Sequence, residues 1–182
     1  MLVSYQISTT MRTPYGKSHP ERKHMPKQIS CGLLMYDNSV DLCVLLAHPG
    51  GPFFANKDDG SWSIPKGLVD SDDTDLLQTA KREFVEETGY DLSDVSEFLP
   101  LDSVKLKSGK LVHAWAFAGM WEDGRVPDSN TFTIEWPPRS GREQAFPEID
   151  RAEMFSIDEA RTKINLGQSP LLERLVERLG LS

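Results

Sequence analysis

Residues 81–90 read KREFVEETGY, and the spacing of the acids in this stretch decides the fold. Glu83, Glu86 and Glu87 are three and four residues apart, so on a helix their carboxylates would share one face and repel one another. Gly89 is a typical helix stop, because the residue just past a helix often takes a left-handed conformation. The acids would then lie near the negative end of the helix dipole. A cation bound among them would relieve the repulsion, whereas the alternative is a solvated acidic face.

The sequence around this stretch predicts a helix from about Thr74 to Thr88. Upstream, residues 70–75 read DSDDTD, and Asp and Thr side chains there can cap the free N–H groups at the start of a helix. Apolar residues then recur at spacings of three and four, which indicates a face directed at a core. These residues are Leu76, Leu77, Ala80 and Phe84.

Short apolar runs separated by turn residues predict strands on both sides of this helix. Residues 29–36 and 40–48 flank Asp37 and Asn38, which predicts a β-hairpin. The other expected elements are a short strand at 62–69 broken by Pro65 and Gly67, two strands within 102–121 around the turn KSGK, a strand at 130–136, a loop at 137–151, a helix beginning near Ser156 or Ile157, and an amphipathic C-terminal helix within 169–180.

The composition is that of an ordinary globular protein. A chain of 182 residues with 38% hydrophobic and 26% charged residues suits one domain with a core of its own. The formal net charge of −8 argues against a nucleic-acid polymer as partner, which would need a basic face. It leaves room for a small anionic substrate, because a metal ion or a basic loop can reverse the field locally. No apolar run reaches the ~20 residues that span a bilayer, so no membrane association is expected.

The two ends of the domain are also predicted from composition. Residues 1–26 are basic and lack a long apolar run, which indicates a disordered leader or an over-extended start, with Met25 as the more natural first residue. A transit peptide is the alternative. Residues 27–182 are expected to form a single domain. Cys31 and Cys43 lie in apolar runs and are expected to be free thiols in a reducing cytoplasm.

The acids have a chemistry that suits phosphate. Mg²⁺ or Mn²⁺ prefers oxygen ligands, usually carboxylates together with substrate phosphates and water. Such an ion could bridge pyrophosphate oxygens and lower the pKa of a bound water, while a further carboxylate takes the proton. Gly67 would let the backbone approach closely, and Arg82, four residues before Glu86, would brace that carboxylate.

Gly67 and residues 82–90 resemble the signature of the Nudix hydrolases. The signature of that family is Gly, five residues, Glu, seven residues, then Arg-Glu, an apolar residue, any residue, Glu-Glu, any residue, Gly and an apolar residue. Residues 82–90 match the second half at every fixed position. The first half departs, because the interval from Gly67 to Arg82 is one residue too long. No Glu stands in the expected place, which Asp72, Asp73 or Thr74 occupies.

Two further stretches, HPGGPFFANKDDGSWSIPKG (48–67) and EWPPRSGREQAFPEIDRAEMF (135–155), look like a bacterial Nudix subgroup known broadly as nucleotide pyrophosphohydrolases. The resemblance implies an α/β (α+β) fold, a mixed sheet sandwiched between helices, with the signature forming a loop, a helix and a loop. It also implies hydrolysis of a nucleoside diphosphate linked to another group, such as a nucleoside triphosphate or a dinucleoside polyphosphate. A module that senses a nucleotide without cleaving it is the alternative.

The resemblance further implies roles for individual residues. Glu83, Glu86 and Glu87 would be metal ligands and catalytic residues, with the Gly67 carbonyl completing the shell. One of these glutamates, or Glu148 on a later loop, would act as general base.

Candidate substrate-binding residues come from basic and aromatic side chains. Lys66 would contact phosphate or simply lie at the surface before a turn. Arg139 and Arg142 would clamp phosphate oxygens through bidentate hydrogen bonds or form structural ion pairs. Trp62 and Trp136 would stack on a base, although buried strand aromatics are more common.

Overall fold

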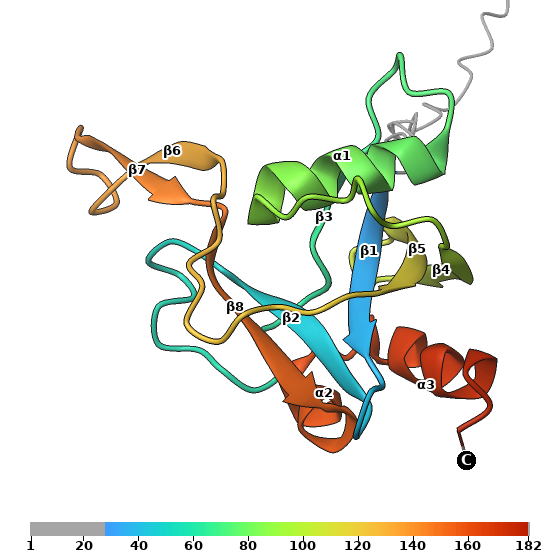
Figure 1. Ribbon diagram of the computed structural model, residues 1–182. Coiled ribbons are helices and arrows are strands. Elements are labelled where there is room, and N and C mark those ends of the chain that lie inside the picture. Colours follow the sequence, from blue (N-terminus) through green and yellow to red (C-terminus); the bar gives the residue numbers. More distant parts are fainter. Residues whose placement is uncertain (1–27, 182) are drawn as a thin grey trace, which may run out of the picture.

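The computed structural model describes residues 28–181, so the predictions for residues 1–26 lie outside the described part. Within it, one helix separates two runs of strands, and two further helices follow the last strand (Figure 1). The strands are β1 (Ile29–Asp37), β2 (Cys43–Pro49), β3 (Lys66–Leu68), β4 (Leu99–Lys105), β5 (Leu111–Ala118), β6 (Thr131–Glu135), β7 (Glu143–Pro147) and β8 (Ile149–Ser156). The helices are α1 (Leu76–Thr88), α2 (Ile157–Lys163) and α3 (Ser169–Arg178).

Six of the strands form one mixed sheet with β1 near its middle. The order is β4-β5-β1-β2-β8, and β3 pairs with the first part of β1. β1 and β5 run parallel from the pair Ile29 and Leu111 to the pair Tyr36 and Ala118, whereas the other pairings are antiparallel. The predicted hairpin of β1 and β2 is confirmed, with Tyr36 opposite Val44. The mixed sheet expected from the resemblance is therefore observed.

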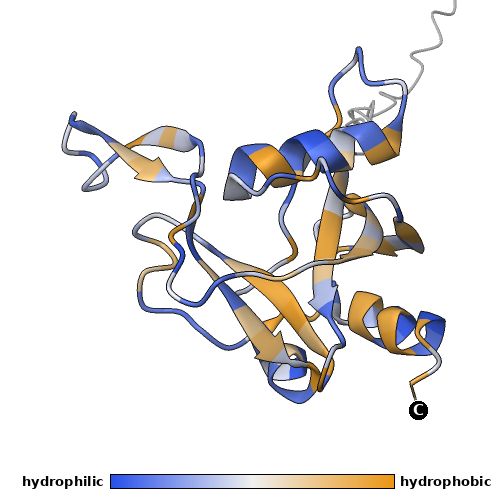
Figure 2. Ribbon diagram, in the orientation of Figure 1, coloured by the Kyte–Doolittle hydropathy of each residue, from blue (hydrophilic) through white to orange (hydrophobic). Residues whose placement is uncertain are grey.

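Each face of the sheet carries its own core, and helices cover both faces (Figure 1). Alternate residues of β1 point to opposite sides, so Leu33 packs under α1 while Leu34 packs toward α3. The same alternation in β5 directs Phe117 toward α1 and the small Ala116 toward α3. Figure 2 shows the apolar strands lying between helices whose outer surfaces are polar.

The predicted limits of the central helix are close to those of α1. Asp75 caps its start, accepting hydrogen bonds from the N–H groups of Leu77 and Gln78. Gly89 ends it in the left-handed region at φ 65°, and its N–H donates to the Val85 carbonyl. The helix starts two residues later than expected, because the capping residue is Asp75, the last acid of the predicted capping segment.

Two expectations about strands were wrong. The strand expected at 62–69 is reduced to β3, since Pro65 cannot donate to a ladder and the segment before it makes only isolated bridges. The loop expected at 137–151 contains β7 and the start of β8. β6 and β7 form a separate two-stranded hairpin that projects from the body of the molecule (Figure 1).

The C-terminal predictions are confirmed. α2 begins after Ser156, whose hydroxyl and Glu159 form a reciprocal capping box. α3 begins with a proline in its first turn and buries one apolar stripe, which includes Leu171 and Leu175. Cys31 and Cys43 are free thiols, as expected. None of the helices described in residues 28–181 is long and apolar enough to span a membrane.

Phe84 is a main contact of α1 with the sheet. Phe84 is fully buried and meets Phe117 edge to face, with ring centroids 5.2 Å apart. Its replacement by Ala removes a whole ring from the core and is expected to lower the free energy of unfolding by about 3–5 kcal/mol, measured by urea denaturation. The neighbouring Val85, 41% exposed, is the control. Val85→Ala should change stability by less than about 1 kcal/mol, and equal losses in both variants would contradict this packing.

Candidate active site

Glu87 is a buried carboxylate at the end of α1. Only 8% of the residue is exposed, and its Oε2 accepts a hydrogen bond of 2.7 Å from the backbone N–H of Lys66. Burial raises the pKa of Glu87 from 4.5 to about 8, and the nearby Glu148 and Glu83 add to the increase. Burial disfavours the ionised form of this carboxylate, and a nearby cation would stabilise it.

Glu83 lies directly against the backbone of Gly67. A Cβ at position 67 would overlap the Glu83 carboxylate, so no other residue fits there without displacing that side chain. Burial raises the pKa of Glu83, and the neighbouring Glu86 raises it further. The close approach predicted for this glycine is therefore confirmed, and it brings the backbone of β3 to the acidic face of α1.

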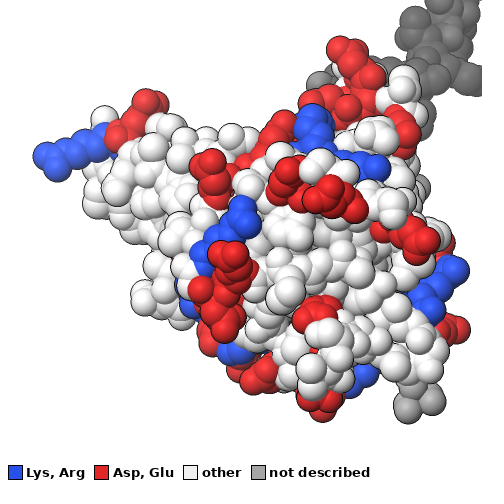
Figure 3. All heavy atoms as spheres, viewed as in Figure 1, with Lys and Arg blue, Asp and Glu red and all other residues white. Residues whose placement is uncertain are grey.

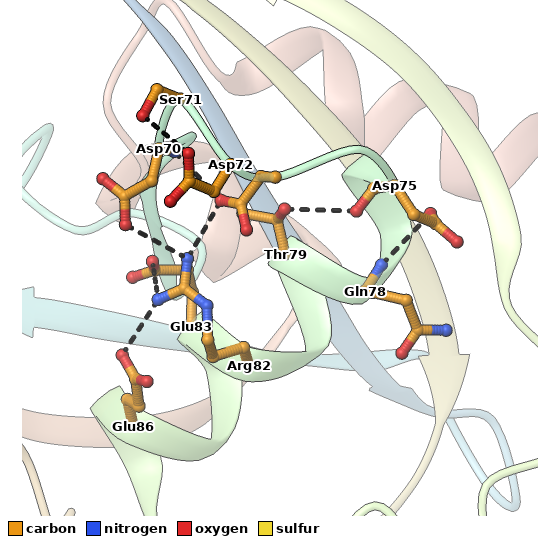
Figure 4. A network of polar contacts seen from close by, with 10 residues as sticks. Asp70, Ser71, Asp72, Asp75, Gln78, Thr79, Arg82, Glu83 and Glu86 are labelled. Carbon is orange, nitrogen blue, oxygen red and sulfur yellow. Dashed lines mark hydrogen bonds and ion pairs between the residues drawn. The ribbon is translucent and has the colours of Figure 1, made fainter.

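Arg82 holds the exposed side of the acidic cluster together (Figure 4). Its Nη1 lies 2.7 Å from Oε1 of Glu83 and 3.3 Å from Oε2 of Glu86, so the predicted brace on Glu86 is present. Its Nη2 lies 3.2 Å from Oδ2 of Asp73. Asp73 thus supplies an acid from the loop before α1, where the expected Glu is missing. A hydrogen bond from the Asp70 N–H also holds the pKa of Asp73 below its usual value.

The buried acids open onto a cavity of about 320 Å³. Its lining mixes carboxylates, lysines and backbone from four parts of the chain: Lys66, Gly67, Leu68, Asp70, Glu83, Glu87, Lys110 and Glu148. Glu148, which lies between β7 and β8, is thereby brought to the glutamates of α1, as predicted. Two larger hollows elsewhere, of about 380 and 550 Å³, contain none of these carboxylates.

Lys110 is a site residue that the sequence did not reveal. It ends the turn between β4 and β5 and reaches the cavity because β5 runs parallel to β1. Burial lowers the pKa of Lys110, and the nearby Lys66 lowers it further. A lysine in a KSGK turn reads as a surface residue, so only the parallel pairing of β1 and β5 identifies it.

The cavity residues fit a hard divalent cation by donor type and charge. The surface is rich in oxygen atoms, which come from the carboxylates and from the backbone that approaches them at Gly67. Burial disfavours these carboxylates as anions, so a bound cation would stabilise them. Within residues 28–181, no three His, Cys, Asp or Glu side chains stand close enough together to hold an ion as they are positioned. Rotation of the glutamate side chains is therefore needed to bring their oxygens to ligand distance.

The structure does not gather every predicted site residue at this cavity. Glu86 lies outside it with a side chain that is 41% exposed and paired to Arg82. Arg139 and Arg142 lie in the tip loop of the β6–β7 hairpin and are not part of the lining. In Figure 3 a basic side chain projects from this hairpin, away from the acidic surface over α1.

Trp62 lies in the core and not at the cavity. Only 1% of the residue is exposed, and its Nε1 donates a hydrogen bond of 2.7 Å to Asp58. Its ring meets Phe155 edge to face. The prediction that Trp62 stacks on a base is not supported by this position, because a buried ring offers no face to a ligand.

Comparison with known proteins gives the context of this site. A family model described as the NUDIX domain matches residues 26–175. No curated protein matches the chain. A C. elegans Ap4A hydrolase has a similar structure, with a TM-score of 0.58 and 18% identity over 83% of this chain and 98% of that one.

Two further solved structures share the fold. The NUDIX domain of Shewanella oneidensis NrtR, solved with ADP ribose, has a TM-score of 0.56 and 16% identity over 89% of this chain and 94% of that one. A mutT/nudix family protein from Listeria innocua has a TM-score of 0.55 and 17% identity over 86% and 96%. Since the family model spans most of the described residues, and the signature residues Glu83 and Glu87 line a common cavity with Gly67, the chain belongs to the NUDIX family.

Proposed function

We propose that this protein is a pyrophosphohydrolase that uses Mg²⁺ or Mn²⁺ to cleave a nucleoside diphosphate linked to another group, with water as nucleophile. The observation that supports it most is the cavity in which the partly buried Glu83 and the buried Glu87 lie beside Gly67, together with two lysines. This arrangement pairs negative donors for a cation with positive donors for phosphate. The two free cysteines are consistent with a reducing cytoplasm as its location.

Each residue of the cavity has a proposed task. Glu83 and Glu87 would hold the ion, with Glu86 turning in from Arg82 and the Gly67 carbonyl as a further ligand. When bound, the ion would neutralise charge on the phosphate oxygens and lower the pKa of a water molecule. Glu148 is exposed at the rim and would accept the proton from the attacking water.

The lysines would hold the phosphates. Lys66 and Lys110 line the same cavity from β3 and from the β4–β5 turn, and they lie close enough for the charge of Lys66 to lower the pKa of Lys110. Ammonium groups donate to phosphate oxygens as compact point charges. Phosphate bound there would lie between the lysines and the carboxylates that would hold the ion.

The proposed substrate class is a nucleoside diphosphate linked to another group. A dinucleoside polyphosphate and a mononucleoside triphosphate both carry a pyrophosphate bond that this cavity would accept. One structure with this fold is an Ap4A hydrolase, and another holds ADP ribose. Both ligands named there contain a nucleoside diphosphate, which supports the same class here.

A turnover screen tests the proposal. Purified protein with Mg²⁺ is assayed against nucleotide sugars, dinucleoside polyphosphates, ADP-ribose, coenzyme A and damaged triphosphates. We expect turnover of at least one compound, and a loss of kcat of ~10²-fold or more in Glu87→Gln, the size expected for a lost ligand or base.

The matched control for this loss is Glu177→Gln, a charge-equivalent change on the exposed side of α3. It should leave kcat unchanged. Equal turnover by wild type and Glu87→Gln would remove Glu87 from the mechanism. Nucleotide binding without turnover of any compound would favour the sensing module instead.

The buried position of Glu87 predicts how pH and metal affect stability. Because the folded pKa of about 8 exceeds the ordinary 4.5, the folded protein retains a proton that the unfolded chain has lost between these values. With a chelator present, the contribution of Glu87 to the free energy of unfolding should be greatest below pH 4.5 and should fall by ~2–4 kcal/mol as pH rises from 4.5 to about 8. Glu87→Gln should flatten this decline, and Mn²⁺ should reduce it in the wild type. Parallel urea-denaturation profiles for both proteins would contradict the prediction.

The position of Lys110 predicts a separate effect on substrate binding. Lys110→Met removes a charged donor to phosphate, and we expect KM to rise ~10-fold or more, since hydrogen bonds to charged groups contribute about 1.5–3 kcal/mol. Lys107→Met, three residues earlier in the same turn and outside the cavity, is the control. Steady-state kinetics on the best substrate measures both, and an unchanged KM in Lys110→Met would exclude this lysine from phosphate binding.

A further inference from the structure

An aromatic pair lies on two segments that meet beside Glu148. Phe53, in the loop after β2, and Trp136, directly after β6, contact each other edge to face with ring centroids 5.6 Å apart. Phe53 is 60% exposed despite this contact, and Trp136 is half-buried. A large ring that keeps most of its surface in solvent, yet is held by a second ring, is a surface on which a flat ligand can stack.

The loop that carries Phe53 is fixed to the site at both ends. At its start, the N–H of Gly50 donates a 2.9 Å hydrogen bond to the carbonyl of Glu148. At its end, the buried His48 ring places Nε2 2.8 Å from the Lys57 carbonyl and Nδ1 2.7 Å from Asp150. Both anchors lie on or next to β8, so the position of Phe53 relative to Glu148 is set by the fold.

The hairpin that carries Trp136 is attached at the same place. Glu148 follows β7 directly, and its N–H donates to the Asn130 carbonyl just before β6. Near the base of the hairpin, the ring of Phe132 lies against Gly51, where a Cβ would come within 2.9 Å of it. The loop and the hairpin therefore contact each other at two levels, once through Phe132 and once through the aromatic pair.

The aromatic pair is within reach of a nucleotide bound at the cavity. Phe53 is three residues from Gly50, so its Cα lies at most ~11 Å from that of Gly50, which is bonded to Glu148. Glu148 lines the cavity that holds the carboxylates and lysines. A ribose and its phosphates can bridge a gap of this size between a base and a reacting phosphate.

We propose that Phe53 and Trp136 form the nucleobase-binding surface of this enzyme, with the base stacked on the exposed face of Phe53 and Trp136 supporting that ring. This proposal rests on the proposed function, since it places the phosphates of the same ligand at Glu83, Glu87 and the two lysines. It assigns to the β2–β3 loop and the β6–β7 hairpin the recognition of an aromatic base.

A comparison of ligands with and without a base tests the surface by kinetics. Phe53→Ala and Trp136→Ala should each raise KM for a cleaved nucleotide ~10-fold, the scale of one lost base–aromatic stack, with kcat within about twofold. The inhibition constant of tripolyphosphate, which has no base, should be the same in both variants as in the wild type. Phe53→Tyr retains the ring and should retain the wild-type KM. Met120→Ala, which removes an exposed apolar side chain elsewhere, is the control.

A binding measurement separates this proposal from the proposed function. AMP and ADP are titrated against the intrinsic tryptophan fluorescence of the full chain, in wild type and in Trp136→Phe. We expect quenching in the wild type and its loss in Trp136→Phe, whether or not any compound is cleaved. Quenching without turnover supports the surface and overturns the hydrolase. Turnover with an unchanged KM in both alanine variants overturns the surface and leaves the hydrolase standing.

Discussion

The hydrogen bond from the Lys66 amide to the Glu87 carboxylate joins the start of β3 to the last turn of α1. Glu87 is buried because β3 passes so close to α1, and β3 can pass so close because Gly67 has no side chain to meet Glu83. One missing Cβ therefore sets the distance between strand and helix. The rest of the cavity is built around this contact, with Lys66 on one side and the glutamates on the other.

The electrostatics of the site oppose those of the whole molecule. The chain carries a net charge of −8, and burial makes the two inner glutamates still harder to ionise. Lys66, Lys110 and Arg82 surround those glutamates and partly offset their charge. An acidic protein can thus offer a phosphate-binding surface, because a few cations placed at short range outweigh the screened charge of a distant surface.

The sequence predicted the parts of the site that depend on local spacing. Glu83, Glu87 and Gly67 follow from helical periodicity and from a turn, and the structure brings these three together. Lys110 could not be predicted, because its position depends on a strand pairing that joins distant segments. For Trp62 the sequence left a base-stacking ring and a buried strand aromatic as alternatives, and the structure buries it in the core. Arg139 lies in a loop, as predicted, but the loop expected at 137–151 was too long, because the strand EQAFP (143–147) carries weak strand signals.

The parallel pairing of β1 with β5 has a consequence for how the molecule is made. Ile29 lies opposite Leu111, so residues 82 positions apart must meet before the middle of the sheet is complete. Closing so long a segment costs chain entropy that only later contacts repay, and high contact order slows folding. Lys110 directly precedes β5, and Glu148 lies later still. A growing chain that has emerged only as far as α1 therefore lacks both of these cavity residues, although Glu83, Glu87 and Lys66 are already present. The charged lining of the cavity is completed late in biosynthesis.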